Sequence, residues 1–286
     1  MRGGGEEGDG AKNQTHPSLS SSCPLTSPSS QTQEQSTNDI WRCICTSVHR
    51  AIAQNNIDPH SIRGIGFDAT CSLAVFTHDT DEPVSVTGPN FDSSASGNDH
   101  NVVLWLDHRP VEETKLINNT KHNLLRYVGG TMSIEMEIPK VLWLKNNMPK
   151  ELFDRCKFYD LTDALEHIAT GNEKRSFCSV VCKQGYVPVG VDGSVKGWQE
   201  DFLKEIGLED LAEDNFKRMG GVNGVVSLFL SVLVQFLNSC EFLWSPLLCR
   251  QLKATNACLF SVIPEKELLT NISTRRLTER RVPLCR

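Results

Sequence analysis

The spacing of hydrophobic residues divides this chain into three segments. In the first, residues 1–37, Gly, Ser, Thr, Gln and Pro predominate, and Leu19 and Leu25 are almost the only large apolar residues. Such a segment buries too little apolar surface to offset the conformational entropy that ordering removes. We therefore predict that residues 1–37 are disordered.

The second segment, residues 38–218, carries helical and strand periodicities in alternation. Continuous apolar runs predict strands at 62–67, 72–76 and 102–106. Helical spacing predicts a helix capped by Asn38 or Asp39, and further helices at 110–126, 139–146, 161–170 and 199–206. Helices that alternate with short strands are typical of a layered α/β domain.

The third segment, residues 219–286, starts with an uncharged apolar stretch at 222–240 and ends in a basic sequence at 274–281. The stretch is long enough to cross a bilayer, but polar Asn, Ser and Gln side chains recur within it and lower its hydrophobicity. We predict a divergent tail that contains an amphipathic or core helix. A membrane anchor is the less favoured alternative.

Composition and charge narrow the class of protein. Hydrophobic residues make up 39% of the chain and charged residues 22%, as in ordinary soluble domains. The net charge of −6 argues against a nucleic-acid-binding protein, which normally carries a basic face. The 11 cysteines show no zinc-finger spacing, and the N-terminal sequence has no apolar signal-peptide core. We expect free thiols, no metal site and a cytoplasmic location.

Three sequence motifs carry the candidate chemistry: GIGFDATCS at 64–72, WLDHR at 105–109 and PKVLWLK at 139–145. In the first, Asp68, Ala69 and Thr70 end an apolar strand, where an α/β sheet normally presents the groups that bind its ligand. In the second, Asp107 and Arg109 offer a carboxylate and a guanidinium, which suit a ligand with many hydroxyl groups. The alternatives are a turn capped by Asp68 and an Asp–Arg pair that fixes the next helix start.

In this order and at this spacing, the motifs resemble the N-terminal domain of FGGY carbohydrate kinases, nearest the ribulokinases. Weaker matches are YDLTDAL at 159–165 and KGW at 196–198. The resemblance implies an actin-like, ribonuclease-H-like ATPase fold and transfer of the ATP γ-phosphoryl group to a hydroxyl of a pentulose such as D-ribulose. It also implies a set of sugar contacts: Asp68, Ala69, Thr70, Asp107, Arg109 and Lys196.

Several neighbours of these residues have a simpler interpretation. For Lys196, an ordinary solvated lysine is the alternative to sugar contact. Helical spacing places Trp143 on the face of its helix that packs against the interior. We interpret Lys140, Trp143 and His108 as structural residues. Cys71 has no activating base in its motif, so we do not expect a nucleophile there.

Two parts of the family's site have no counterpart in the sequence. The disordered start stands where the family has its ATP-phosphate loop, and no Asp-x-x-x-Gly string supplies the catalytic aspartate after Gly221. We therefore expect a partial N-terminal domain without a catalytic residue or a metal ligand, although the family uses ATP and Mg²⁺. Such a chain is inactive by itself, and its strand at 62–67 has an open edge that the tail is available to cover.

A second hypothesis belongs to a different functional class. A chain that keeps the sugar contacts but lacks the ATP groups would act as a non-catalytic protein. It would bind the sugar or regulate the full-length kinase as a partner.

Overall fold

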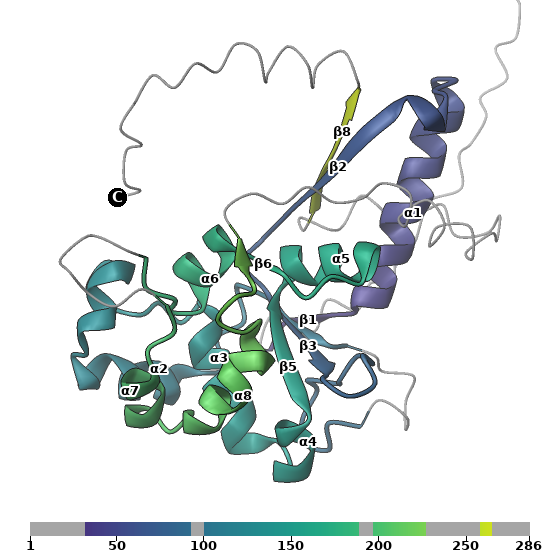
Figure 1. The fold of residues 1–286 in the computed structure, drawn as a ribbon. Coiled ribbons are helices and arrows are strands. Elements are labelled where there is room, and N and C mark those ends of the chain that lie inside the picture. Colours follow the sequence, from purple (N-terminus) through teal and green to yellow (C-terminus); the bar gives the residue numbers. More distant parts are fainter. Residues whose placement is uncertain (1–31, 93–99, 189–196, 227–257, 265–286) are drawn as a thin grey trace, which may run out of the picture.

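The structure is a computed structural model that describes residues 32–92, 100–188, 197–226 and 258–264 (Figure 1). Three sequence-based predictions fall outside these ranges in whole or in large part. They concern the disordered start as far as residue 31, the loop that contains Lys196, and the apolar stretch from residue 227 to 240.

A four-stranded antiparallel sheet forms the centre of the domain. Its strand order is β1 (Glu34–Gln35), β4 (Val102–Val103), β3 (Leu73–Thr77) and β5 (Cys156–Asp160). β3 pairs with β5 along its whole length, with Leu73 opposite Asp160 and Thr77 opposite Cys156. We call the Leu73–Asp160 end of this ladder the corner end and the Thr77–Cys156 end the far end.

Alternate side chains of β3 face opposite sides of the sheet, because a strand has a side-chain period of two. Leu73 and Val75 belong to one hydrophobic core, and Ala74 and Phe76 belong to the other. The second core is covered by two neighbouring helices (Figure 1), α1 (Thr37–Gln54) and α5 (Leu161–Thr170). The first core is covered mainly by α2 (Val111–Thr120), α3 (Glu137–Asn147) and α7 (Glu200–Glu205).

Short elements complete the domain. The remaining α-helices are α4 (Lys150–Asp154), α6 (Phe177–Lys183) and α8 (Glu213–Phe216). Short 3₁₀ helices lie at Pro59–Ser61, Asn123–Val128, Glu209–Ala212 and Lys217–Met219. A parallel pair of very short strands joins β6 (Arg175–Ser176) to β7 (Val225–Val226).

A second sheet pairs β2 (Ile62–Ala69) with β8 (Cys258–Pro264) in antiparallel register (Figure 1). On its inner side β2 packs against α1, where the rings of Phe67 and Trp41 lie 6.2 Å apart. The edge that we expected to be open is therefore covered by a strand of the third segment. That strand comes from residues 258–264 and not from the apolar stretch.

The helix predicted at 161–170 is confirmed residue for residue, and it ends where Gly171 adopts the left-handed conformation with φ +67°. The helix predicted at 110–126 is shorter, because Lys121 turns left-handed after Thr120, and a separate 3₁₀ helix follows at Asn123–Val128. The cap of α1 also differs. Ser36 Oγ, and not Asn38 or Asp39, accepts the hydrogen bond that caps this helix, from the backbone N–H of Asp39.

Two further differences concern strands and the tail. Residues 32–37, which composition assigned to the disordered start, form β1 and begin α1. Cys156–Asp160 forms a buried strand at one edge of the four-stranded sheet. The sequence did not suggest this strand, because Lys157 and Asp160 interrupt its apolar run. At the start of the predicted tail helix, Val225–Val226 is a strand. No helix among the described residues has the length and apolarity needed to cross a membrane.

Candidate functional site

The first two motifs meet at Ser72, at the corner end of the ladder. Ser72 Oγ lies 3.2 Å from Thr70 Oγ1 and accepts a hydrogen bond of 3.2 Å from the backbone N–H of Trp105. The carbonyl of the same residue accepts 2.8 Å from the N–H of Leu161, the first residue of α5. One buried serine therefore ties the end of β2 to the segment after β4 and to the sheet.

The third motif reaches the same corner through Lys140. This side chain is buried, and its ammonium donates to the carbonyls of Leu104 at 2.8 Å, Glu135 at 2.9 Å and Trp105 at 3.3 Å. The three carbonyls use all three ammonium protons. Burial lowers the pKa of Lys140, and nearby acidic groups oppose that shift. Because Leu104 and Trp105 turn their carbonyls to Lys140, the strand predicted at 102–106 ends at Val103.

Asp107 lies beneath this corner and is fully buried. Its Oδ1 accepts from the backbone N–H and Nε of Arg109 at 3.0 and 2.9 Å. Its Oδ2 accepts from Arg109 Nη2 at 2.7 Å and from the backbone N–H of Gln33 at 2.6 Å. Both carboxylate oxygens are thus engaged by the protein, in the two-pronged arrangement that Arg and carboxylates favour.

Arg109 extends the pairing across the sheet. It donates to Glu34 Oε1 at 2.6 Å and to the carbonyl of Val86 at 3.0 Å, and its guanidinium carbon lies 4.9 Å from the ring centre of Trp143. Burial works against the charge, but the hydrogen bonds and charges of Asp107 and Glu34 outweigh it and raise the pKa of Arg109. This is the arrangement expected of a structural Asp–Arg pair, and sugar contact by either residue stays a prediction.

The other predicted contacts differ in accessibility. Asp68 is exposed near the end of β2, opposite Leu259, and its carboxylate has no hydrogen-bond partner among the described residues. Ala69 and Thr70 are half-buried beside it. Lys196 lies outside the described residues. The structure thus joins Thr70 to the second motif through Ser72, and leaves Asp68 as the outward carboxylate of the set.

Sequence reasoning missed a group of buried polar side chains behind the corner. Asp160 Oδ2 accepts from Lys183 Nζ at 2.8 Å and from Ser179 Oγ at 2.9 Å. Glu137 Oε2 accepts from Gln184 Nε2 at 2.6 Å. Acidic residues at the end of a strand and at the start of a helix were the available signal, but nothing local showed that they meet.

Cys71 faces these groups from the turn between β2 and β3. Its Sγ lies 3.6 Å from the carbonyl of Glu135. Burial and then the charge of Glu137 raise its thiol pKa. Since the thiolate is the reactive form of cysteine, Cys71 is not set up as a nucleophile.

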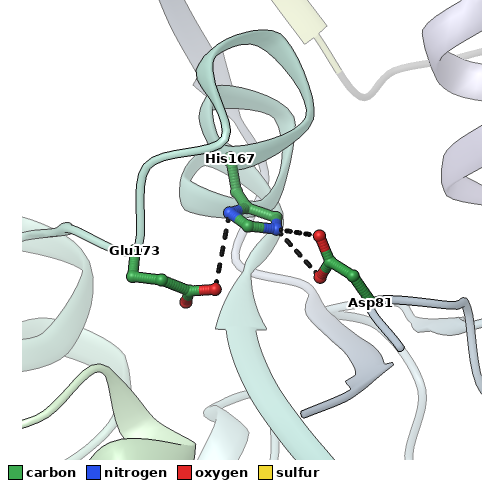
Figure 2. A group of neighbouring side chains, drawn as sticks. All are labelled: Asp81, His167 and Glu173. Carbon is green, nitrogen blue, oxygen red and sulfur yellow. Dashed lines mark hydrogen bonds and ion pairs between the residues drawn. The ribbon is translucent and has the colours of Figure 1, made fainter. Parts of the chain in front are cut away.

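At the far end of the ladder, Asp81, His167 and Glu173 bring their ligand atoms within 4.8 Å of one another (Figure 2). His167 Nδ1 lies 2.9 Å from the carbonyl of Asn172, and its Nε2 lies 2.9 and 2.8 Å from the two carboxylate oxygens of Asp81. Both ring nitrogens face oxygen atoms, so the ring donates on both sides only as an imidazolium.

The far-end group has the spacing of metal ligands, but it already contains a cation. Lys157 Nζ lies 2.7 Å from Asp81 Oδ1 and 2.8 Å from Glu173 Oε1. Its ammonium supplies the positive charge that a metal ion would bring between these carboxylates. A cavity of about 630 Å³ adjoins the group, and His78, Lys157, Lys174 and Lys217 are among its lining residues.

Comparison with known proteins identifies the family of the domain that contains this corner. Residues 12–186 match the model of the N-terminal domain of the FGGY family of carbohydrate kinases. The chain belongs to this family. FGGY proteins are ATP-dependent sugar kinases, and all three motifs that led to this prediction lie within the matched residues.

Curated relatives agree with the family match. The chain is 51% identical over 187 residues to the D-ribulokinase YDR109C of Saccharomyces cerevisiae, covering 65% of this chain and 26% of that protein. It is 44% identical over 189 residues to the FGGY carbohydrate kinase domain-containing protein of Homo sapiens, covering 65% of this chain and 31% of that protein. The chain thus spans about a quarter to a third of the length of these relatives.

Solved structures confirm the predicted fold class. The chain matches a xylulose kinase from Lactobacillus acidophilus with a TM-score of 0.53 at 16% identity, over 76% of this chain and 39% of that one. It matches the "xyloylose kinase" from Brucella ovis with a TM-score of 0.51 at 18% identity, over 64% of this chain and 34% of that one. Both likenesses concern the fold, which is the actin-like ATPase fold of FGGY kinases.

Proposed function

We propose that this chain carries the sugar-binding part of an FGGY kinase that acts on a pentulose, with D-ribulose as the expected substrate. One observation carries the proposal: the three motifs of the family meet at a single corner, joined by Ser72 and Lys140. The choice of sugar rests on the D-ribulokinase of Saccharomyces cerevisiae, with which the chain shares 51% identity over the matched region.

Within this proposal some corner residues contact the sugar, and others hold the structure around it. Each sugar hydroxyl both donates and accepts a hydrogen bond, so a carboxylate and a hydroxyl side chain suit it. Asp68 and Thr70 offer these groups beside Ala69, and we propose Lys196 as a further donor. Asp107 and Arg109 have their polar atoms engaged with each other, so they would meet the sugar only in addition to their structural pairing.

FGGY kinases use ATP, usually with Mg²⁺, whose role in phosphoryl transfer is to neutralise charge on the transferred group. The sequence carries no counterpart of the family's ATP-phosphate loop and no Asp-x-x-x-Gly string after Gly221. We therefore propose that this chain alone binds sugar without transferring phosphate.

Two measurements on the full chain test these proposals separately. Calorimetric titration with D-ribulose should show saturable binding, while coupled ADP release with Mg-ATP and D-ribulose should stay at the blank rate. Absence of binding by a folded chain would overturn the sugar assignment. Sugar-dependent ADP release would overturn the proposal of inactivity and would show that this chain forms a nucleotide site of its own.

Asp68→Asn is the most direct variant for the sugar site. The substitution is at an exposed position, so we expect little change in stability but a roughly tenfold or larger loss of D-ribulose affinity, since a charged hydrogen bond becomes a neutral one. Glu205→Gln, on the exposed end of α7, is the matched control that should leave affinity unchanged. Equal affinities for both variants would remove Asp68 from the site.

Two consequences of the proposal concern the cell. If the chain binds sugar without catalysis, it acts as a sugar-binding protein or as a partner of a full-length kinase. Co-purification with that kinase over a range of concentrations tests the second role. We also propose a cytoplasmic location, since the cysteines whose side chains the structure describes form no disulfide with one another, which is typical of proteins in a reducing compartment.

A further inference from the structure

Two acidic side chains are buried together behind the corner. Glu137 is the first residue of α3, and Asp160 is the last residue of β5 and the N-cap of α5. Both are fully buried, with 0% exposure. Two ionised carboxylates in contact at such depth would repel each other and would lose their hydration without compensation.

The hydrogen bonds of the pair show how this cost is avoided. Glu137 Oε2 accepts from Gln184, and Asp160 Oδ2 accepts from Lys183 and Ser179. The other oxygen of each carboxyl, Glu137 Oε1 and Asp160 Oδ1, meets no N–H or O–H donor of the described residues. Each carboxyl therefore keeps one buried oxygen without a partner, and one proton held between the two side chains would give both of these oxygens a partner.

The surrounding charges favour placing that proton on Glu137. Lys183 lies 2.8 Å from Asp160 and neutralises one carboxylate. Burial, followed by the charge and hydrogen bond of Asp160, raises the pKa of Glu137 well above its usual value, whereas Lys183 and Gln184 oppose the shift. The other ionisable groups around the pair are Cys71 from the β2–β3 turn, Lys140 from α3 and Asp163 from α5.

We propose that Glu137 and Asp160 share one proton and, as a carboxylic acid–carboxylate pair, hold the sugar corner in position. The inference rests on the proposed function for its second half. Its first half, the shared proton, rests on the full burial of both side chains and on the unpartnered oxygen that each of them keeps. Neither residue is assigned a contact with the sugar, so both are positioning residues.

The pair can act on the corner by two direct routes. Asp160 lies opposite Leu73 in the ladder, and the next residue, Leu161, donates its N–H to the carbonyl of Ser72. Glu137 lies one helical turn before Lys140. The ammonium of Lys140 binds the carbonyls of Leu104 and Trp105, at the start of the second motif. Separating the two carboxyls would therefore move α3 and β5 apart at the point where Ser72 and Lys140 converge.

Glu137→Gln and Glu137→Ala separate the proposal from a general packing effect. The Gln amide keeps the shape, accepts from Gln184 and donates to Asp160 in place of the shared proton. We expect Glu137→Gln to bind D-ribulose as the unsubstituted chain does. We expect Glu137→Ala to bind it about tenfold more weakly, because it leaves buried polar groups unpaired.

Alkylation of Cys71 reports on the corner without any sugar. The rate at which iodoacetamide modifies Cys71 is followed by peptide mass spectrometry at constant pH. Its thiol touches Glu135 and faces the pair, so Glu137→Ala should speed this modification about tenfold, whereas Glu137→Gln should not. The modification rate of Cys178, an exposed thiol, serves as the internal control.

The pH dependence of unfolding tests the shared proton itself. Because the pKa of Glu137 is raised in the folded chain, its contribution to stability is complete below the unfolded value and is lost as pH rises through the folded value. The melting temperature of the unsubstituted chain should therefore fall as pH rises from the usual range of carboxyls towards this raised pKa. That fall should be smaller in Glu137→Gln, which cannot lose the proton.

The outcomes are distinguishable. If Glu137→Gln alters Cys71 alkylation as much as Glu137→Ala does, or has the same pH profile as the unsubstituted chain, the shared proton is wrong. If the alkylation rates and the pH profiles are as expected but the chain binds no D-ribulose, the shared proton is supported and the proposed function is wrong. Should Glu137→Ala not fold, Glu137→Gln and the pH profile still decide the question.

Discussion

The two ends of the β3–β5 ladder handle charge in opposite ways. At the corner end, Glu137, Asp160 and Asp163 are buried, and burial raises the pKa of Glu137 and that of Asp163, the latter to about 7. At the far end, the carboxylates of Asp81 and Glu173 have side chains 52% and 55% exposed. There the hydrogen bonds from neighbouring groups outweigh burial and lower both pKa values.

This difference indicates which end of the ladder holds its polar side chains in one fixed arrangement. A buried polar group is held in one arrangement, because every alternative leaves it without a partner and without water. An exposed ion pair is replaceable by water at little cost. The buried groups of the corner end are therefore held in fixed positions, as the proposed sugar site requires. The far end resembles a solvated set of ion pairs beside a cavity.

The largest effect is expected from Arg109→Met. It leaves the buried carboxylate of Asp107 without its two-pronged partner, which should cost about 3–5 kcal/mol of unfolding free energy. Urea unfolding at neutral pH measures it. Arg155→Met, which removes the exposed far-end partner of Asp79, is the matched control and should leave the urea midpoint nearly unchanged. Equal losses would erase the contrast between the two ends.

A change in pH should affect the two ends in opposite directions. The pKa of Asp163 is raised from 3.8 to about 7 by burial, so its stabilising contribution falls as pH rises across that interval. Asp163→Asn should flatten this part of the profile of melting temperature against pH. Asp81 and Glu173 have lowered pKa values, so their contribution is lost only as pH falls below the usual range of carboxyls. An unchanged profile in Asp163→Asn would contradict the assignment.

The smallest effect is expected from Asp81→Asn. Half of this side chain is exposed, so losing its pairs with Lys157 and His167 should cost less than about 1 kcal/mol. Added salt should reduce the difference further, because salt screens exposed charges. Urea unfolding at low and high ionic strength checks both points. A loss of several kcal/mol would show that the far end is as rigidly built as the corner.

Several features of the fold could be predicted because their signals are local. The helix at 161–170 has an apolar stripe and a terminal glycine, and the structure reproduces its bounds. The strand at 72–76 has a continuous apolar run and appears as Leu73–Thr77. β5 escaped prediction because its Lys157 and Asp160 break the apolar run, and both owe their burial to partners elsewhere in the chain.

The motifs of the corner could be found in the sequence, but their contacts could not. Only the structure showed that the three motifs meet, that Lys140 binds three carbonyls and that Asp107 is fully engaged. Glu137, Asp160 and Lys183 were overlooked, because isolated acidic and basic residues are usually solvated.

By itself, the sequence determined the family and the layered arrangement of this protein. Motif order and apolar periodicity can be recognised in the sequence alone, because each depends on residues that are near one another along the chain. Only the tertiary structure decided which charges are buried, that β8 completes the edge of β2, and that Glu137 meets Asp160. Those outcomes depend on water being excluded between segments distant in sequence, and the strength of every charge interaction at the corner follows from that exclusion.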